Sequence, residues 1–158
     1  MSAASLIGRF LVWSAVAGLL GAGVMVAVLS AITRSGLTKV RLVISVGSLF
    51  TRSYERAEAV GWFVHAVLGI FFGQIYALVL VAIGAQGVGV NLAWGAGLGL
   101  FHGLMMGLVL IGAVSDAHPL EEFQQRSFPI ALSYCVAHFF YGLVVGTIIG
   151  LSGIIVPH

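Results

Sequence analysis

The chain has 158 residues, of which 60% are hydrophobic and only 8% are charged. A soluble domain carries roughly 25% charged residues, so too few charges are present to cover a water-facing surface, which excludes a soluble globular fold. The formal net charge of +2 reflects very few charges and gives no case for nucleic-acid binding.

Long uncharged runs predict transmembrane helices. They cover residues 10–33, 59–115 and 127–158. A crossing needs about 20 apolar residues, and the middle run is long enough for two crossings, broken at residues 84–91. We predict an all-α integral membrane bundle of four transmembrane helices, one domain over residues 1–158, with helices at about 10–32, 59–83, 92–114 and 129–155. A β-barrel would instead show alternating strands of about ten residues.

A cleaved signal peptide is the alternative for the first helix. Its uncharged run is too long for the apolar region of a signal peptide, and only Arg9 supplies a basic flank. We therefore expect a retained transmembrane helix.

The connection between the first two helices holds most of the basic residues. Five of the seven lie there: Arg34, Lys39, Arg41, Arg52 and Arg56. The positive-inside rule places this connection in the cytoplasm and both termini outside, although Arg9 argues weakly for the opposite orientation.

Apolar residues alternate with basic ones in the same connection. We predict a short interfacial segment at about 37–50, lying in the headgroup region. Its basic residues would meet anionic lipid, each contributing about 1 kcal/mol. A solvated loop that only carries topology signals is the alternative.

The second connection covers residues 115–126. Pro119 suits the first position of a helix, and Glu121 and Glu122 suit its first turn, which predicts a solvated, capped turn. Asp116, His118, Glu121 and Glu122 could alternatively ligate a metal ion.

The chain contains an internal similarity. Residues 13–19 match residues 94–100, each beginning with tryptophan, and residues 65–73 match 138–146, each with the pattern His-x3-Gly-x3-Gly. The similarity predicts two repeated helical hairpins in a parallel arrangement.

Glycines recur every fourth position and predict close helix packing, because small residues let backbones approach in lipid. The candidate packing glycines are Gly69, Gly73, Gly95, Gly99, Gly103, Gly107, Gly142 and Gly146.

Three histidines lie inside the predicted membrane segments: His65, His102 and His138. Counted from the charged ends at about 1.5 Å per residue, they lie roughly 9 Å, 18 Å and 12 Å deep. We expect His65 and His138 to share one site, which His102 joins only if its helix tilts. Haem, chlorophyll and a metal ion are the candidate cofactors. The alternative is structural: each imidazole hydrogen-bonds a backbone carbonyl or a hydroxyl such as Tyr134, Ser133 or Tyr141.

Catalytic motifs are missing from the sequence. It shows no hydrolase triad, phosphate loop or HExxH pattern, and we expect no enzymatic activity. The single Cys135 lies within the fourth helix and implies no disulfide framework.

The order of several short motifs is similar to that in a family of small, uncharacterised bacterial four-helix membrane proteins of unknown function. The motifs are residues 47–50, 61–65, 99–103, 118–119 and 138–146. A proline and glycine often seen before the fourth helix of that family are represented only by Pro129. The resemblance implies a four-helix fold in the bacterial inner membrane and a role for the histidines, but no activity.

Three functions remain open. The leading hypothesis is a non-enzymatic accessory or interaction subunit of a larger membrane assembly, because the chain is small, with short loops and no catalytic set. The alternatives are a cofactor binder that uses the histidines and a small transporter or channel. The expected partners are the lipid bilayer and either other membrane subunits or further copies of the chain.

Overall fold

The computed structural model describes residues 2–154. Within them, four helices are long and apolar enough to cross a membrane, and no strand occurs. The long helices are α1 (Ala3–Arg34), α3 (Tyr54–Ala82), α4 (Val88–Val109) and α6 (Phe128–Ser152). A π-helical turn, Leu110–Val114, continues α4 into the short α5 (Ser115–Ala117). The expected fourth helix runs to residue 155, which lies outside the described residues.

A side chain caps the start of α1, and two helices are followed by a residue with left-handed backbone. Ser2 accepts a hydrogen bond from the backbone N–H of Ser5 at the start of α1. Arg52, with φ of 52°, terminates α2 (Leu42–Thr51), and Gly153, with φ of 63°, follows α6. Such left-handed residues let the chain leave a helix while the last carbonyls remain paired.

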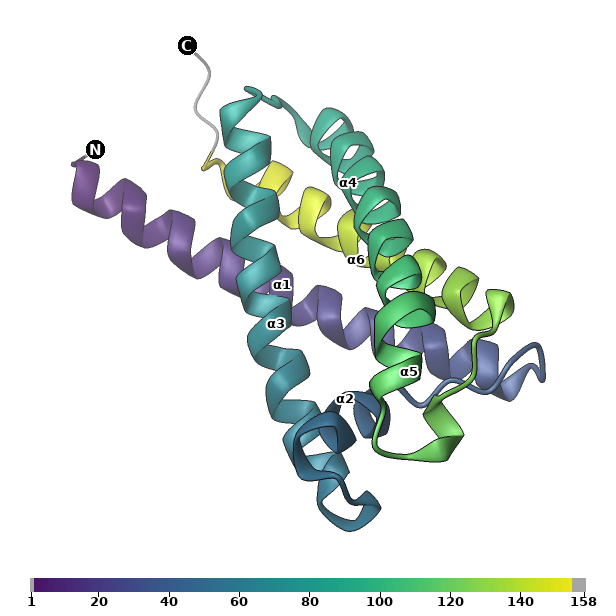
Figure 1. Ribbon diagram of the computed structural model, residues 1–158. Coiled ribbons are helices and arrows are strands. Elements are labelled where there is room, and N and C mark those ends of the chain that lie inside the picture. Colours follow the sequence, from purple (N-terminus) through teal and green to yellow (C-terminus); the bar gives the residue numbers. More distant parts are fainter. Residues whose placement is uncertain (1, 155–158) are drawn as a thin grey trace.

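The long helices pack in the spatial order α3, α1, α6, α4. α1 contacts both α3 and α6, and α6 contacts α4, whereas α3 and α4 contact each other much less closely. Figure 1 shows the start of α1, the end of α6 and the α3–α4 turn at one end of the molecule, with α2 and α5 at the other.

Glycines form the helix contacts. A Cβ placed on Gly73 of α3 would stand 2.6 Å from the Cα of Gly18 in α1, and one on Gly142 of α6 would stand 2.8 Å from the Gly95 carbonyl carbon of α4. Each of the eight candidate packing glycines lies against a neighbouring helix in this way, Gly107 less tightly than the others. Backbone contact of this kind is typical of helices that associate in lipid.

The segment expected in the headgroup region forms α2, which packs against the start of α3. A Cβ on Gly47 would stand 2.7 Å from the backbone nitrogen of Gly61. Leu42, Ser45 and Ser48 are buried with it, while Phe50 is 66% exposed. Its position relative to headgroups stays a prediction.

The two charged connections are bound to each other. Glu122 accepts a hydrogen bond from the Tyr54 hydroxyl and lies 3.5 Å from both Lys39 Nζ and Arg41 Nη1. His118 Nε2 donates to the carbonyl oxygen of Ser45 in α2 at 3.1 Å. No helix begins at Pro119, because His118 is held in extended backbone; a 3-10 turn covers only Glu121–Phe123.

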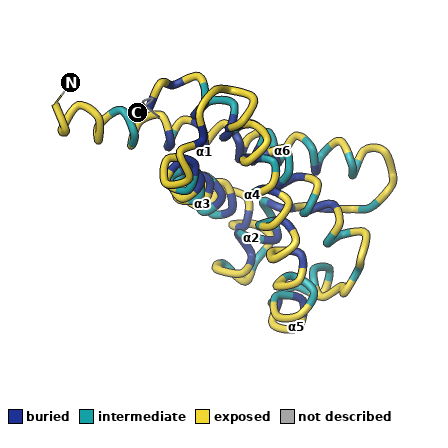
Figure 2. The backbone as a smooth tube through the Cα atoms, turned by 90° about the horizontal axis from the view of Figure 1, so that it is seen from above, coloured by how far each residue is buried: buried dark blue, intermediate teal, exposed yellow. Residues whose placement is uncertain are grey.

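Large apolar side chains cover the outer surface. Figure 2 shows the buried segments on the sides where helices face one another and the exposed segments outside. Phe63 of α3 is 70% exposed and Phe101 of α4 is 64% exposed. Such a surface fits contact with lipid rather than water.

Candidate functional site

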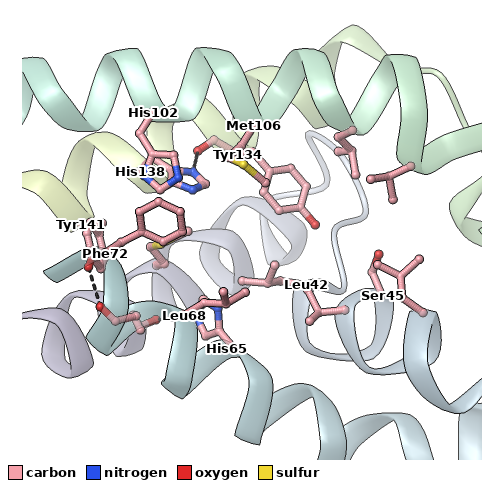
Figure 3. A pocket seen from close by; sticks show the side chains of 17 residues that line it. Leu42, Ser45, His65, Leu68, Phe72, His102, Met106, Tyr134, His138 and Tyr141 are labelled. Carbon is pink, nitrogen blue, oxygen red and sulfur yellow. Dashed lines mark hydrogen bonds between the residues drawn. The ribbon is translucent and has the colours of Figure 1, made fainter. Parts of the chain in front are cut away.

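The three histidines of the long helices line a single cavity. His65 belongs to α3, His102 to α4 and His138 to α6, and the cavity has a volume of about 160 Å³. Figure 3 shows the rings of His102 and His138 close together on one side of it and His65 on the other. The remaining lining is mostly apolar, so the imidazoles are its principal polar groups.

His65 and His138 line one cavity and His102 joins them there, while the sharing of a ligand stays a prediction. The imidazole next to His138 is that of His102, with ring centroids 4.6 Å apart in an edge-to-face arrangement. The depths were counted from the expected charged end of each helix, but these ends are not level. α4 lies antiparallel along α6, with Gly107 against Ala131 and Gly99 against His138, and its π-helical turn continues beyond the start of α6. Residues at different counts from those ends therefore meet.

Backbone carbonyls and one hydroxyl hold the three rings. His65 Nε2 lies 3.1 Å from the carbonyl oxygen of Ala22, and His138 Nδ1 lies 2.7 Å from that of Tyr134. His102 Nδ1 lies 3.2 Å from the Tyr76 hydroxyl. These contacts agree with the alternative in which each imidazole only hydrogen-bonds a backbone carbonyl or a hydroxyl. The hydroxyl that meets His102 belongs to Tyr76 and not to Tyr134, Ser133 or Tyr141.

The carbonyl contacts determine which nitrogen carries the proton. A carbonyl oxygen only accepts, so His65 Nε2 and His138 Nδ1 must donate. In a neutral imidazole the second nitrogen is then a bare acceptor. His65 Nδ1 and His138 Nε2 have no hydrogen-bond partner among the described residues.

Two hydroxyls at the α2 side of the cavity also lack a partner among the described residues, those of Tyr134 and Ser45. Two hydroxyls that we expected as histidine partners, those of Ser133 and Tyr141, instead donate to backbone carbonyls. Ser133 donates to the Pro129 carbonyl at 2.8 Å, and Tyr141 donates to the Gly69 carbonyl at 2.7 Å.

The π-helical turn forms one wall. Leu110 and Val114, its first and last residues, line the cavity. Ser115 Oγ stabilises the turn by donating to the Leu110 carbonyl at 2.7 Å. Turns of this kind occur frequently at functional sites, and no signal that we used in the sequence indicates this one.

The cavity opens on the apolar surface between α2, α3 and α4. Three of its lining residues are partly exposed: Leu49 at 39%, Leu68 at 43% and Met106 at 38%. The residues around this opening are apolar.

The described residues do not form a metal site. They contain no group of three or more His, Cys, Asp or Glu side chains placed to hold a metal ion. The four candidates of the second connection are separated by other contacts: Asp116 pairs with Arg126, Glu122 with Tyr54, and His118 with Ser45. No carboxylate lines the cavity, so nothing there compensates an imidazolium.

Comparison with protein-family models, curated proteins and solved structures finds no match to this chain.

Proposed function

We propose that this protein is a non-enzymatic membrane protein that binds a small lipophilic ligand, taken from the bilayer, in the histidine-lined cavity. The observation that carries the proposal is the convergence of His65, His102 and His138, from three different helices, on one cavity. Mostly apolar cavities with a few polar groups are the usual form of small-molecule sites.

The cavity volume favours a small ligand over a tetrapyrrole. A dry cavity of about 150 Å³ binds benzene or xenon, and this one measures about 160 Å³. Haem and chlorophyll are several times larger than benzene. Either would require α3 and α4 to move apart, so we rank a tetrapyrrole below a single-ring ligand.

We further propose the orientation that the charges predict, in the inner membrane of a bacterium. All five acidic residues and every basic residue except Arg9 belong to the end formed by the two charged connections. Arg9 donates to the carbonyl of Ser152 at 2.7 Å, next to the end of α6. A structural role for Arg9 removes the one basic residue that argued for the opposite orientation.

We also propose that the two helical hairpins are repeats of one unit. α1 packs on α3, and α4 packs on α6, through their small residues. The contacts differ by one turn, since Gly18 of α1 meets Gly73, whereas Gly99 of α4, its counterpart, meets Gly142. An ancestral duplication followed by a slip of one helical turn would produce this offset.

Photolabelling in liposomes tests ligand binding. The probe is an alkylated phenyl diazirine, and the readout is the mass of labelled peptides. We expect labelling near Met106 to saturate and to be displaced by butylbenzene, while labelling of the lipid-facing Phe101 rises in proportion to probe. Labelling that is proportional to probe at every position would contradict the proposal.

A pair of variants on α3 provides the matched control. Leu68→Trp should obstruct the cavity opening and abolish the saturable labelling. Val67 is also exposed, at 48%, but does not line the cavity. Val67→Trp should therefore leave the saturable labelling unchanged.

An interaction subunit is the second candidate function, and the outer face of α4 favours it. The α4 span is 17% buried, against 33% to 44% for the other three spans among the described residues. Gly89, Ala93 and Gly97 lie exposed on that face at four-residue spacing, a pattern that favours helix association. With Cys135 replaced by alanine, Ala93→Cys should crosslink in membranes, and Leu78→Cys on α3 should not. Equal crosslinking at both positions would contradict this function.

A further inference from the structure

The unpaired polar atoms of the cavity specify the chemistry of its ligand. We infer that the ligand is a lipophilic phenol whose aromatic ring occupies the cavity and whose hydroxyl donates a hydrogen bond to His138 Nε2. This inference rests on the proposed ligand-binding function and narrows it to one chemical class.

One nitrogen of His138 and one of His65 remain hydrogen-bond acceptors, so the ligand should carry a donor. Because His138 Nδ1 is engaged by the Tyr134 carbonyl at 2.7 Å, its Nε2 presents a lone pair. His65 presents a second lone pair at Nδ1 for the same reason. A polar atom that faces an apolar cavity costs free energy unless protein, water or a ligand satisfies it. A ligand that only accepts, such as an ether or a ketone, would leave both imidazole lone pairs unpaired.

The cavity walls select an aromatic ring. The volume of about 160 Å³ is close to that of a cavity that accepts benzene. Phe72 packs on His102 with centroids 4.2 Å apart, and Met106 also lines the cavity. Aromatic edges and thioether sulfur both interact favourably with a further ring.

The lateral opening accounts for an alkyl substituent. Leu49, Leu68 and Met106 surround the exit and are apolar. A chain attached to the ring would leave between α3 and α4 into the bilayer. A polar substituent on the ring would instead meet the unpartnered hydroxyls of Tyr134 and Ser45 on the α2 side.

Competition for the saturable photolabel tests the inference. The competitors are 4-butylphenol, 4-butylanisole, butylbenzene and 1-octanol, each compared as a mole fraction of bilayer lipid so that partitioning does not enter. We expect the phenol to displace the label at a concentration about fivefold lower than its methyl ether does, the factor for one hydrogen bond of ordinary strength. His138→Phe should remove that difference and keep displacement by butylbenzene, which also shows that the variant is folded.

A measurement on the unmodified protein covers the case in which His138→Phe does not fold. The ¹⁵N resonance of His138 Nε2 should shift when 4-butylphenol is added and stay unchanged with 4-butylanisole, because only the phenol can donate to the lone pair. An unchanged resonance with both compounds would overturn the inference.

The outcomes separate the inference from the function on which it rests. If the phenol and its methyl ether compete equally while butylbenzene still displaces the label, the cavity binds ligands but does not recognise a phenol. If 1-octanol competes as well as the phenol, the site recognises a hydroxyl without a ring, and the inference is wrong. If no saturable label exists, ligand binding itself is wrong.

Discussion

The hydroxyl of Tyr141 donates a hydrogen bond of 2.7 Å to the carbonyl oxygen of Gly69 and thereby joins α6 to α3. The ring of Tyr141 also covers Gly21 of α1, where an added Cβ would lie 2.7 Å from Tyr141 Cδ2. One side chain of α6 thus contacts both α1 and α3, and it is 2% exposed.

Tyr141→Phe tests this connection. It removes the hydroxyl and keeps the ring, so we expect a loss of about 0.5–1.5 kcal/mol in the free energy of unfolding, measured by reversible unfolding in mixed micelles. Tyr54→Phe is the control, because its hydroxyl binds Glu122 at the exposed end. Equal losses in both variants would show that the Tyr141–Gly69 bond stabilises the fold no more than the exposed Tyr54–Glu122 bond does.

Gly99→Leu tests the α4–α6 contact. A Cβ on Gly99 would stand 3.0 Å from the Phe139 Cα, so the larger side chain must separate the helices. We expect destabilisation of at least about 1–3 kcal/mol, the usual cost of overpacking, seen as a lower melting temperature in detergent. Gly23 lies within α1 with no atom within 4 Å of its added Cβ, and Gly23→Leu should melt no lower than the unmodified protein. The reverse order of stabilities would mean that the packing face is misassigned.

His118→Ala tests the attachment of the second connection to α2. His118 is 2% exposed and donates to the Ser45 carbonyl, which keeps a second bond from Ser48 Oγ after the substitution. We expect a loss of about 0.5–1.5 kcal/mol for the hydrogen bond that is removed, with faster tryptic cleavage after Arg126. Glu121→Gln, an exposed change in the same connection, should leave the cleavage rate unchanged. Slow cleavage in His118→Ala would argue that other contacts hold the connection.

Acid should release the second connection. The pKa of Glu122 lies below the ordinary glutamate range, chiefly because its carboxylate accepts a hydrogen bond from Tyr54 and also because Lys39 and Arg41 lie nearby. A carboxylate with a lowered folded-state pKa stabilises at neutral pH, and the contribution is lost as the pH falls through that pKa.

The readout is hydrogen exchange of residues 118–127 between about pH 6 and pH 3, corrected for the intrinsic rate. We expect exchange to increase toward acid by a modest factor, because the group is partly exposed. Glu122→Gln should exchange fast at every pH, whereas Glu121→Gln should keep the acid-induced increase. A flat profile in the unmodified protein would contradict the prediction.

The orientation can be read from cysteine labelling. In a Cys135→Ala background, single cysteines at Ser2 and Gln86 should react with a membrane-impermeant maleimide added to intact cells. A cysteine at Gln124 should react only after permeabilisation, because we place both charged connections in the cytoplasm. Labelling of the Gln124 position from outside would reverse the assignment.

The long apolar helices could be predicted from the sequence because their signal is local. Each uncharged run, such as residues 59–115, must satisfy its own backbone within the apolar phase, which only a helix or a closed barrel can do. The same reasoning indicated that His65, His102 and His138 were unusual, since polar groups are costly in such segments.

The site itself was decided by tertiary structure. Counting residues from the expected helix ends gave a depth for each histidine but not which helices adjoin, so it did not indicate that the imidazole beside His138 is that of His102. Likewise, nothing local distinguishes His118 from a solvated loop residue; its burial follows from the docking of α2. Helix inclination depends on which small residues meet across an interface, such as Gly18 with Gly73. Which small residues meet depends on two segments together, so the periodicity of one segment alone does not predict it.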